Sequence, residues 1–198
     1  MKNKLLPMKQ NKLVENLTFE NTDYTGKIIS KNEFYRCHFY RCNFSDCNLT
    51  HNTFIDCAFS DCNLSMLKFT GSSLKNVTFK GCKLIGVDFS ECNDFLFKVD
   101  FENCILDYSY YLKKKMAKTS FKGCSIKEAN FTDSDLTQAV FSQCDLSDTV
   151  FERTNLSGAD FSSSYNFVID PEANRIKNAR FSQHGLSGLL QKYGIIIE

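Results

Sequence analysis

The chain has 198 residues, a formal net charge of +1 and 42% hydrophobic residues, which together suit a single folded domain. It contains no run of about 18 apolar residues, so we expect no transmembrane helix. Residues 1–12 lack the continuous apolar core of a secretory signal peptide, and we therefore expect a cytoplasmic protein.

The first residues precede any regular pattern and are predicted to form an N-terminal cap, residues 1–16. Leu13 and Val14 are expected to supply a short edge segment there. An uncovered end of a repeat protein exposes backbone donors, acceptors and apolar side chains, which is why a cap is expected.

From Phe19 onwards, a large apolar residue recurs at every fifth position. One unbroken run of 15 such residues extends from Phe19 to Phe89, and a second run of 14 extends from Leu96 to Phe161. Neither an α-helix nor a β-strand has this period, because their side chains repeat after 3.6 and 2 residues. A short fixed repeat with one large apolar residue per unit predicts a solenoid.

The position two residues before each large apolar residue is predicted to face inward as well. All ten cysteines occupy it, and Ala, Ser, Thr or Val fills it in many other units, as expected for a small buried slot. The spacing contains no C-x-x-C pair and no Cys/His zinc pattern. We therefore interpret the cysteines as buried free thiols and expect no metal and no cofactor.

Four five-residue units are predicted to make one square coil of 20 residues, with successive coils stacked at ~4.8 Å. Outward residues 20 apart in sequence then become neighbours. Nine such pairs carry opposite charges and three carry like charges, which favours this coil length.

Two segments depart from the regular pattern in the middle of the chain. Between Phe89 and Leu96 the step is seven residues, which predicts a bulge or small projecting loop near residues 90–97. Asp94 and Lys114 fall in inward positions by counting, and an unpaired buried charge is costly. We therefore expect distorted units near 90–97 and 108–118, with the lysines turned to solvent.

The predicted solenoid, residues 17–186, contains a third irregular side near residues 165–175, where Asn166 and Pro171 break the pattern. Residues 187–198 are predicted to form a C-terminal cap with a short helix that Ser187 caps. The surplus apolar residues at this end suggest the interface of a twofold homodimer. The candidate interface residues are Leu186, Leu189, Leu190, Tyr193, Ile195, Ile196 and Ile197.

The segment from Glu128 to Glu172 contains nine acidic residues and one basic residue, a charge of −8 in a nearly neutral chain. The candidate acidic partner surface consists of Glu128, Asp133, Asp135, Asp145, Asp148, Glu152 and Asp160. These residues are predicted on an open outer wall with no evident pocket or nucleophile, so we do not expect them to catalyse a reaction. We interpret them first as a solvated face that opposes edge aggregation, and attraction of a basic partner is the alternative.

Outward aromatic and basic residues form two further candidate surfaces, at residues 35–41 and 108–118. Tyrosine and arginine are typical of interfaces, and single-stranded nucleic acid also binds such residues. We interpret both surfaces as solvated and do not expect direct nucleic-acid binding.

Units such as residues 144–148 (CDLSD) and 159–163 (ADFSS) resemble the pentapeptide-repeat family, whose loose pattern is Ala/Cys, Asp/Asn, Leu/Phe and two polar residues. The resemblance covers residues 17–186 and implies a right-handed quadrilateral β-helix. The expected fold class is therefore all-β, with about eight coils and a short C-terminal capping helix.

The chain is also similar in length, coil number and C-terminal cap to quinolone-resistance proteins of the Qnr type. That resemblance implies a DNA-mimicking dimer that binds DNA gyrase or topoisomerase IV and protects it from quinolones. The sequence contains no motif for phosphate binding, metal binding, a catalytic triad or a dinucleotide. We predict a non-enzymatic protein-interaction scaffold with an unknown partner, and the DNA-mimicking dimer is the alternative.

Overall fold

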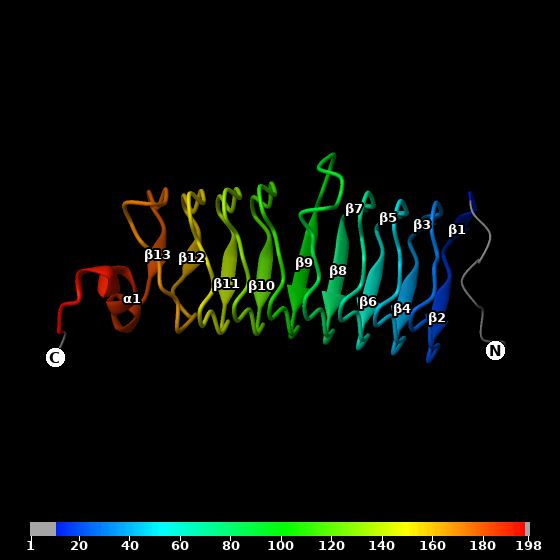
Figure 1. Ribbon diagram of the computed structural model, residues 1–198, viewed down its shortest axis with the longest axis horizontal. Coiled ribbons are helices and arrows are strands. Elements are labelled where there is room, and N and C mark those ends of the chain that lie inside the picture. Colours follow the sequence, from blue (N-terminus) through cyan, green and yellow to red (C-terminus); the bar gives the residue numbers. More distant parts are fainter. Residues whose placement is uncertain (1–10, 197–198) are drawn as a thin grey trace.

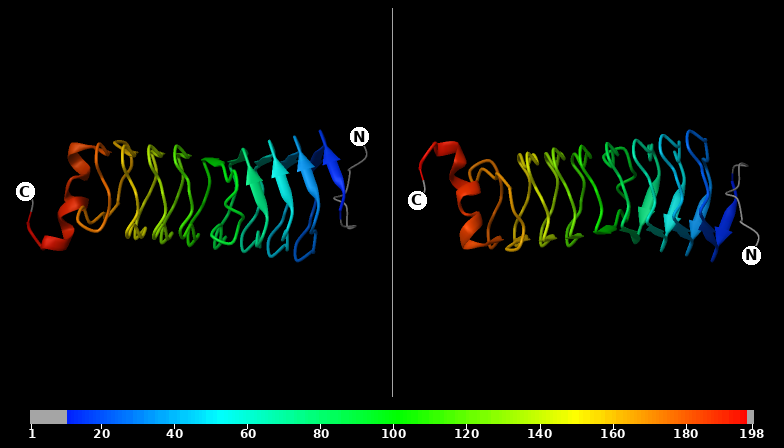
Figure 2. Two further views of the ribbon diagram at one scale, coloured as in Figure 1. Left: turned by 90° about the horizontal axis from the view of Figure 1, so that it is seen from above. Right: turned by 90° about the horizontal axis from the view of Figure 1, so that it is seen from below.

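The computed structural model describes residues 11–196, and these residues form one elongated parallel β-solenoid. Coils of similar outline stack along a single axis from the N-terminal end to a short helical cap at the C-terminal end (Figure 1). Views from above and below show the same straight stack (Figure 2). The predicted all-β solenoid with a short C-terminal helix is confirmed.

Two parallel sheets run along the stack. The four-stranded sheet has the order β1-β3-β5-β7 and contains β1 (Leu13–Glu15), β3 (Glu33–Tyr35), β5 (Thr53–Ile55) and β7 (Ser73–Lys75). The nine-stranded sheet has the order β13-β12-β11-β10-β9-β8-β6-β4-β2. Its strands are β2 (Thr18–Glu20), β4 (His38–Tyr40), β6 (Ala58–Ser60), β8 (Val77–Lys80), β9 (Val99–Glu102), β10 (Ser120–Lys122), β11 (Val140–Ser142), β12 (Asp160–Phe161) and β13 (Arg180–Phe181).

The strand register gives the length of each coil directly. Phe34 of β3 pairs with Phe54 of β5, and Phe121 of β10 pairs with Phe141 of β11, so the register advances by the predicted coil length from strand to strand. Away from the insertion, isolated bridges on the other sides keep the same step, as between Asp135 and Asn155. The predicted coil length is therefore confirmed on more than one side of the solenoid.

The core is a set of stacked apolar side chains, one stack for each side of the coil. The ring of Phe141 lies between those of Phe121 and Phe161, with centroids 4.7 Å away on both sides. All large apolar residues of the first predicted run are buried. Each side chain is covered mainly by the neighbouring coils. A single coil could therefore not bury its own apolar residues.

Leu96 is the one wrong assignment in the second run. It is 62% exposed, with a φ of 58°, and Phe97 occupies the inward position instead. The reason is the two-residue insertion, which the chain accommodates as a turn that projects before it re-enters the side at Phe97 (Figure 1). The predicted projecting loop is confirmed.

All ten cysteines are buried and free, as predicted. Six of them form one continuous column rather than the two columns that a constant step between coils implies. The insertion places Cys104 directly after Cys82 in the stack, since the neighbouring Ile105 N–H donates to the Cys82 carbonyl at 2.9 Å. The column consists of Cys42, Cys62, Cys82, Cys104, Cys124 and Cys144.

The C-terminal cap consists of η1 (Gln183–Gly185), α1 (Ser187–Leu190) and η2 (Gln191–Tyr193). The prediction that Ser187 caps the helix is wrong, because Ser187 is the first helical residue and makes no capping hydrogen bond. The capping serine of this region is Ser182, which caps η1: its hydroxyl accepts from the Gly185 N–H at 3.1 Å. Because η1 ends at Gly185 and Leu186 is the N-cap of α1, Ser187 lies within the first turn of α1.

At the other end, β1 continues the four-stranded sheet, and its Val14 is buried. Residues 1–10 of the predicted N-terminal cap and Ile197 of the predicted interface lie outside the described residues. No helix within residues 11–196 has the length and apolar character needed to cross a membrane.

Candidate functional site

The seven predicted acidic residues do not gather on one surface. Asp160 lies in β12 of the nine-stranded sheet, whereas Asp145 and Asp135 form bridges on two other sides of the coil. Asp133 and Glu152 flank the stacked Phe131 and Phe151 on the remaining side. The repeat therefore distributes the acidic segment around the solenoid, and any single partner would contact only part of it.

Glu128, Asp145 and Asp148 lie on one side of the solenoid in two successive coils, with Lys127 paired to Asp145. Glu128 and Asp148 lie one coil apart, and the Glu128 N–H donates to the Ser147 carbonyl at 3.0 Å. Asp145 precedes the inward Leu146 of the same side. This group is the part of the predicted acidic surface that the fold brings together.

Basic residues neutralise much of the rest. Arg153 bonds Asp133 through Nε at 2.7 Å and Nη2 at 3.1 Å, and its Nη1 lies 2.6 Å from Glu152. Arg180 lies 3.7 Å from Asp160. Arg180 belongs to the next coil, outside the acidic segment, so the net charge of the segment overstates the field at its surface.

Asp145 is held firmly as a carboxylate. Partial burial acts to raise its pKa, but hydrogen bonds from Ser147, Asn166 and Lys127 outweigh burial and lower the pKa to about 2. The Lys127 ammonium lies 3.1 Å from Asp145 Oδ2. Asp145 therefore keeps its charge under all ordinary conditions.

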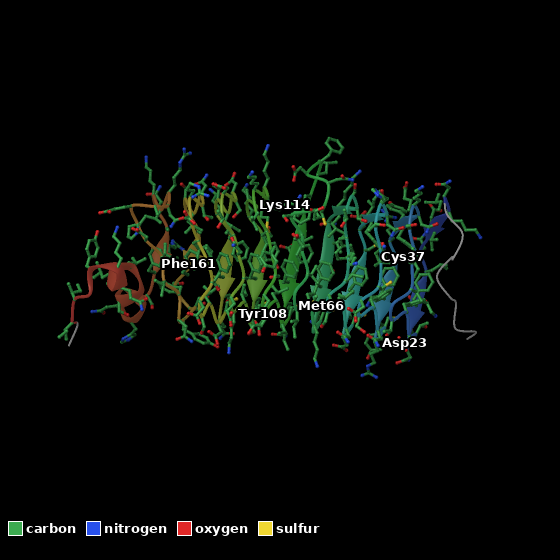
Figure 3. All side chains as sticks on the ribbon, in the orientation of Figure 1. Asp23, Cys37, Met66, Tyr108, Lys114 and Phe161 are labelled. Carbon is green, nitrogen blue, oxygen red and sulfur yellow. The ribbon has the colours of Figure 1, made fainter. Side chains whose placement is uncertain are left out.

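The prediction for the unit around Lys114 is wrong. The unit keeps the regular fold, and the Lys114 side chain points inward and is only 2% exposed. Its ammonium donates to the Cys92 carbonyl and, at 2.7 Å, to Asp94 Oδ1. Burial of the charge is tolerated because the projecting loop supplies two acceptors, which the sequence pattern did not reveal. Lys114 is labelled beside the projecting loop in Figure 3.

The projecting loop carries an apolar tip. Phe95 is 73% exposed and Leu96 is 62% exposed, and the Lys75 ammonium lies 5.4 Å from the centre of the Phe95 ring. Four exposed lysines lie on the loop's own coil and the next one, and none of them takes part in an ion pair among residues 11–196. We call them the lysine cluster: Lys98, Lys113, Lys115 and Lys118.

The predicted Tyr/Arg surface is present in the first coils. The Arg36 and Arg41 guanidinium groups each lie 4.7 Å from the ring centre of the preceding tyrosine, Tyr35 or Tyr40. Arg41 also approaches Asp61 at 4.0 Å. The rings are thus covered by their own neighbouring arginines, which leaves less ring surface for a base to stack on.

The C-terminal end has a concave surface. A groove of about 910 Å³ lies between the last irregular coil and the cap, and its lining includes Tyr165, Phe167, His184, Leu190 and Ile195. Leu186, Tyr193, Ile195 and Ile196 are 45%, 53%, 55% and 89% exposed. Leu189 is partly buried and packs against the core, so it attaches the cap to the solenoid and adds little to the exposed apolar surface.

The cap is fastened to the irregular side by charged residues. The Lys192 ammonium lies 2.6 Å from both Asp170 and Glu172, and the Tyr193 hydroxyl donates to Glu172 at 2.9 Å. The hydrogen bond from Lys192 lowers the pKa of both carboxyls. These hydrogen bonds attach the cap to the irregular side at residues 165–175.

No group of three or more His, Cys, Asp or Glu side chains within residues 11–196 is arranged to hold a metal ion. The histidines are scattered along the stack, and His38 Nε2 lies 2.9 Å from the Ser60 hydroxyl. The cysteine column lies inside the solenoid.

Two family models match the chain. "Pentapeptide repeat region" matches residues 32–111, and "Pentapeptide repeats (8 copies)" matches residues 115–143 and 124–162. Together they cover more than half of the sequence, and they agree with the five-residue period of the structure. The chain belongs to the pentapeptide-repeat family.

Solved structures show the same fold. A trypsin-treated variant of QnrB1, a plasmid-mediated fluoroquinolone resistance protein, aligns with a TM-score of 0.72 at 20% identity and covers 93% of this chain and 99% of that one. A second trypsin-treated variant gives 0.71 at 20% identity over 95% and 100%. Full-length QnrB1 gives 0.62 at 18% identity over 92% and 100%. No curated protein sequence matches the chain.

Proposed function

We propose that this chain is a non-enzymatic protein-interaction scaffold that acts as a homodimer joined at its C-terminal ends. The observation that carries the dimer is the exposed apolar surface formed by Leu186, Tyr193, Ile195 and Ile196 beside the groove. Exposed apolar surface that gathers at one place marks an interaction site. The rest of the stack offers outward side chains at fixed spacing, which is what a scaffold presents to a partner.

A twofold dimer suits this position better than a chain of subunits. The cap covers the last coil, so the next copy cannot simply extend the sheets. A twofold axis at the cap pairs the same surface with itself and closes the assembly at two copies. We place the dimer in the cytoplasm, where a reducing environment preserves free thiols such as the ten of this chain.

Light scattering tests the dimer. The parent chain should show a mass of about 45 kDa, twice the 22.7 kDa of one chain. Leu190→Arg, and Ile196→Arg at a position that is 89% exposed, should both shift the mass to that of one chain. Val140→Arg, on the exposed flank of β11, is the control and should remain dimeric. A parent that is monomeric at all concentrations would refute the dimer.

A second candidate function is protection of DNA gyrase or topoisomerase IV from quinolones by a DNA-mimicking dimer. It is supported by the similarity to QnrB1 over nearly the full length of both chains. The acidic group Glu128, Asp145 and Asp148 provides a negative surface on one side of each subunit, as a DNA mimic requires.

Gyrase supercoiling in the presence of a fluoroquinolone tests this candidate. Titration with the chain should restore supercoiling, and a variant with Glu128 and Asp148 replaced by Gln and Asn should restore less. If the folded, dimeric chain neither restores nor inhibits supercoiling, gyrase is not its partner and the scaffold has another one.

A further inference from the structure

Lys114 is the one fully buried charged side chain among residues 11–196. It lies in an inward column that is polar in almost every coil and consists of Asn32, Asn52, Ser72, Cys92, Lys114, Ser134, Thr154 and Asn174. Side chains in this column usually donate to the backbone of the coil before them: Ser72 Oγ bonds the Leu49 carbonyl at 2.6 Å, and Thr154 Oγ1 bonds the Phe131 carbonyl at 2.9 Å. Lys114 follows the same rule with a much longer side chain.

The length of that side chain matches the insertion. The two extra residues turn the chain outward after Cys92, and the Lys114 ammonium reaches both the Cys92 carbonyl and the Asp94 carboxylate. It also lies 5.2 Å from the centre of the Phe97 ring, where the chain turns back inward. One ammonium therefore contacts the beginning, the middle and the end of the loop at residues 92–97.

Asn93 adds a second attachment at the base of the loop. Its side-chain amide donates to the Gly71 carbonyl at 2.8 Å and to the Ser73 hydroxyl at 3.1 Å. Above this base, Phe95 and Leu96 are the exposed apolar side chains, and the lysine cluster belongs to the loop's own coil and the next one. Acidic residues of the following coil face part of the cluster, since Asp133 interacts electrostatically with Lys113 and Asp135 pairs with Lys115 in an isolated β-bridge. The loop thus has a fixed base and an apolar tip, with exposed lysines on the same and the next coil.

We propose that the loop at residues 92–97 is a rigid contact element for an acidic protein surface, and that Lys114 is the positioning residue that locks it. This inference rests on the proposed scaffold function and names one contact surface and its chemistry. The partner would bring an apolar pocket for Phe95 and Leu96, rimmed by carboxylates that face the lysine cluster.

The fixed base favours a protein over other partners. A pocket of defined shape gains from a tip that is already ordered, because binding then loses less conformational entropy. A fluid lipid surface gains nothing from this order. The Lys75 ammonium lies over the Phe95 ring, which leaves less ring surface for a nucleic-acid base to stack on.

Hydrogen exchange of the isolated chain tests the lock. Lys114→Met keeps the length of the side chain and removes its donors. The amides of Asn93, Phe97 and Lys98, which donate to backbone carbonyls, should therefore exchange faster by about tenfold or more, the factor that corresponds to about 1.4 kcal/mol. Amides of β10 and β11 should keep their protection. Lys115→Met, an exposed neighbouring lysine, and Ser134→Ala, whose hydroxyl has no hydrogen-bond partner among the described residues, are matched controls.

A second variant guards against a failure of Lys114→Met to fold. Asp94→Asn retains an acceptor on a side chain that is 70% exposed, so the solenoid should remain folded while the loop amides lose protection. Loop amides that exchange at the parental rate in both folded variants would overturn the lock.

Photo-crosslinking in cells tests the contact. A photoreactive phenylalanine analogue at Phe95 should form an adduct with a protein, and the crosslinked peptide should be rich in Asp and Glu beside apolar residues. The adduct should decrease by about tenfold when Lys114→Met is added, the same loss expected for the lock. The same analogue at Val140 tests for a partner at the exposed flank of β11, and at Ile196 it tests for a partner at the C-terminal cap.

The outcomes separate the two proposals. Adducts with another protein at Val140 but none at Phe95 would refute the loop contact and leave the scaffold function intact. No adduct with another protein at any of the three positions would refute the scaffold function itself. A nuclease-sensitive adduct at Phe95, or an adduct with lipid, would assign the tip to a different class of partner and overturn the inference.

Discussion

Val77 pairs with Val99 across a step that is longer, by the two inserted residues, than the steps of the strand pairs before and after it. The sheet is continuous through this point, and Phe79 still stacks on Phe101 with ring centroids 5.3 Å apart. The two extra residues are therefore accommodated entirely within the projecting loop. Neighbouring coils keep their register because each coil contacts only the coils beside it.

Insertions should accordingly be tolerated at the loop and not within a side. Adding two glycines between Asp94 and Phe95 should change the free energy of unfolding by less than about 1 kcal/mol, because a modestly longer loop closes at little extra entropic cost. The same insertion between Val140 and Phe141 should abolish cooperative unfolding, since it displaces inward residues. Urea denaturation measures both, and equal effects at the two sites would contradict the account.

Substitution of a stacked ring tests the core. Phe141→Ala removes a buried ring that contacts Phe121 and Phe161, and it should lower the free energy of unfolding by ~3–5 kcal/mol. Val140→Ala, whose parent residue is 41% exposed, is the neighbouring control and should change it by no more than about 0.5 kcal/mol. If Phe141→Ala unfolds at the parental urea concentration, the inward assignment of the repeat is wrong.

The cysteines should be unreactive until the solenoid opens. Burial raises the pKa of the Cys47 and Cys92 thiols to about 12, so neither forms a thiolate near neutral pH. With a coloured thiol reagent at pH 8, none of the ten thiols should react before unfolding, and all ten should react in denaturant. Rapid reaction of several thiols in the folded chain would show that the column is accessible.

Stability should decline in acid partly through Asp145. Its pKa is lowered to about 2 in the folded chain and is ~3.9 in an unfolded one, so its stabilising effect is present above ~3.9 and is lost as the pH falls towards 2. The free energy of unfolding of the parent should therefore fall more between pH 4 and 2 than that of Asp145→Asn. Parallel pH profiles for the two chains would contradict this assignment.

Most of the fold could be predicted from the sequence because each repeat places the same kind of side chain at the same inward position. Phe141 and Cys144 could each be placed inward from spacing alone, and the register of β10 and β11 followed from the predicted coil length. Leu96 and Lys114 were misplaced for different reasons. Counting back from Phe161 assigned Leu96 inward, whereas Phe97 occupies that position after the insertion. Counting placed Lys114 inward correctly, but its charge was expected to turn to solvent, because the acceptors that the loop supplies could not be foreseen.

The candidate surfaces were harder to predict than the fold. The acidic segment is continuous in sequence, but the four-sided coil distributes Asp135, Asp145 and Asp160 over different sides. Charges from the next coil, such as Arg180, then neutralise part of it. The apolar C-terminal residues Ile195 and Ile196 are exposed, and their role in an interface stays a prediction.

The most direct test of the end-to-end dimer is its maximum dimension by small-angle X-ray scattering. About eight coils at ~4.8 Å give a subunit of ~40 Å, so two subunits joined at their caps should span ~80 Å or more. Leu190→Arg should reduce the maximum dimension to about that of one subunit. A parent of dimeric mass but with the length of one subunit would mean that the copies lie side by side, and it would contradict the assignment of the C-terminal end as the interface.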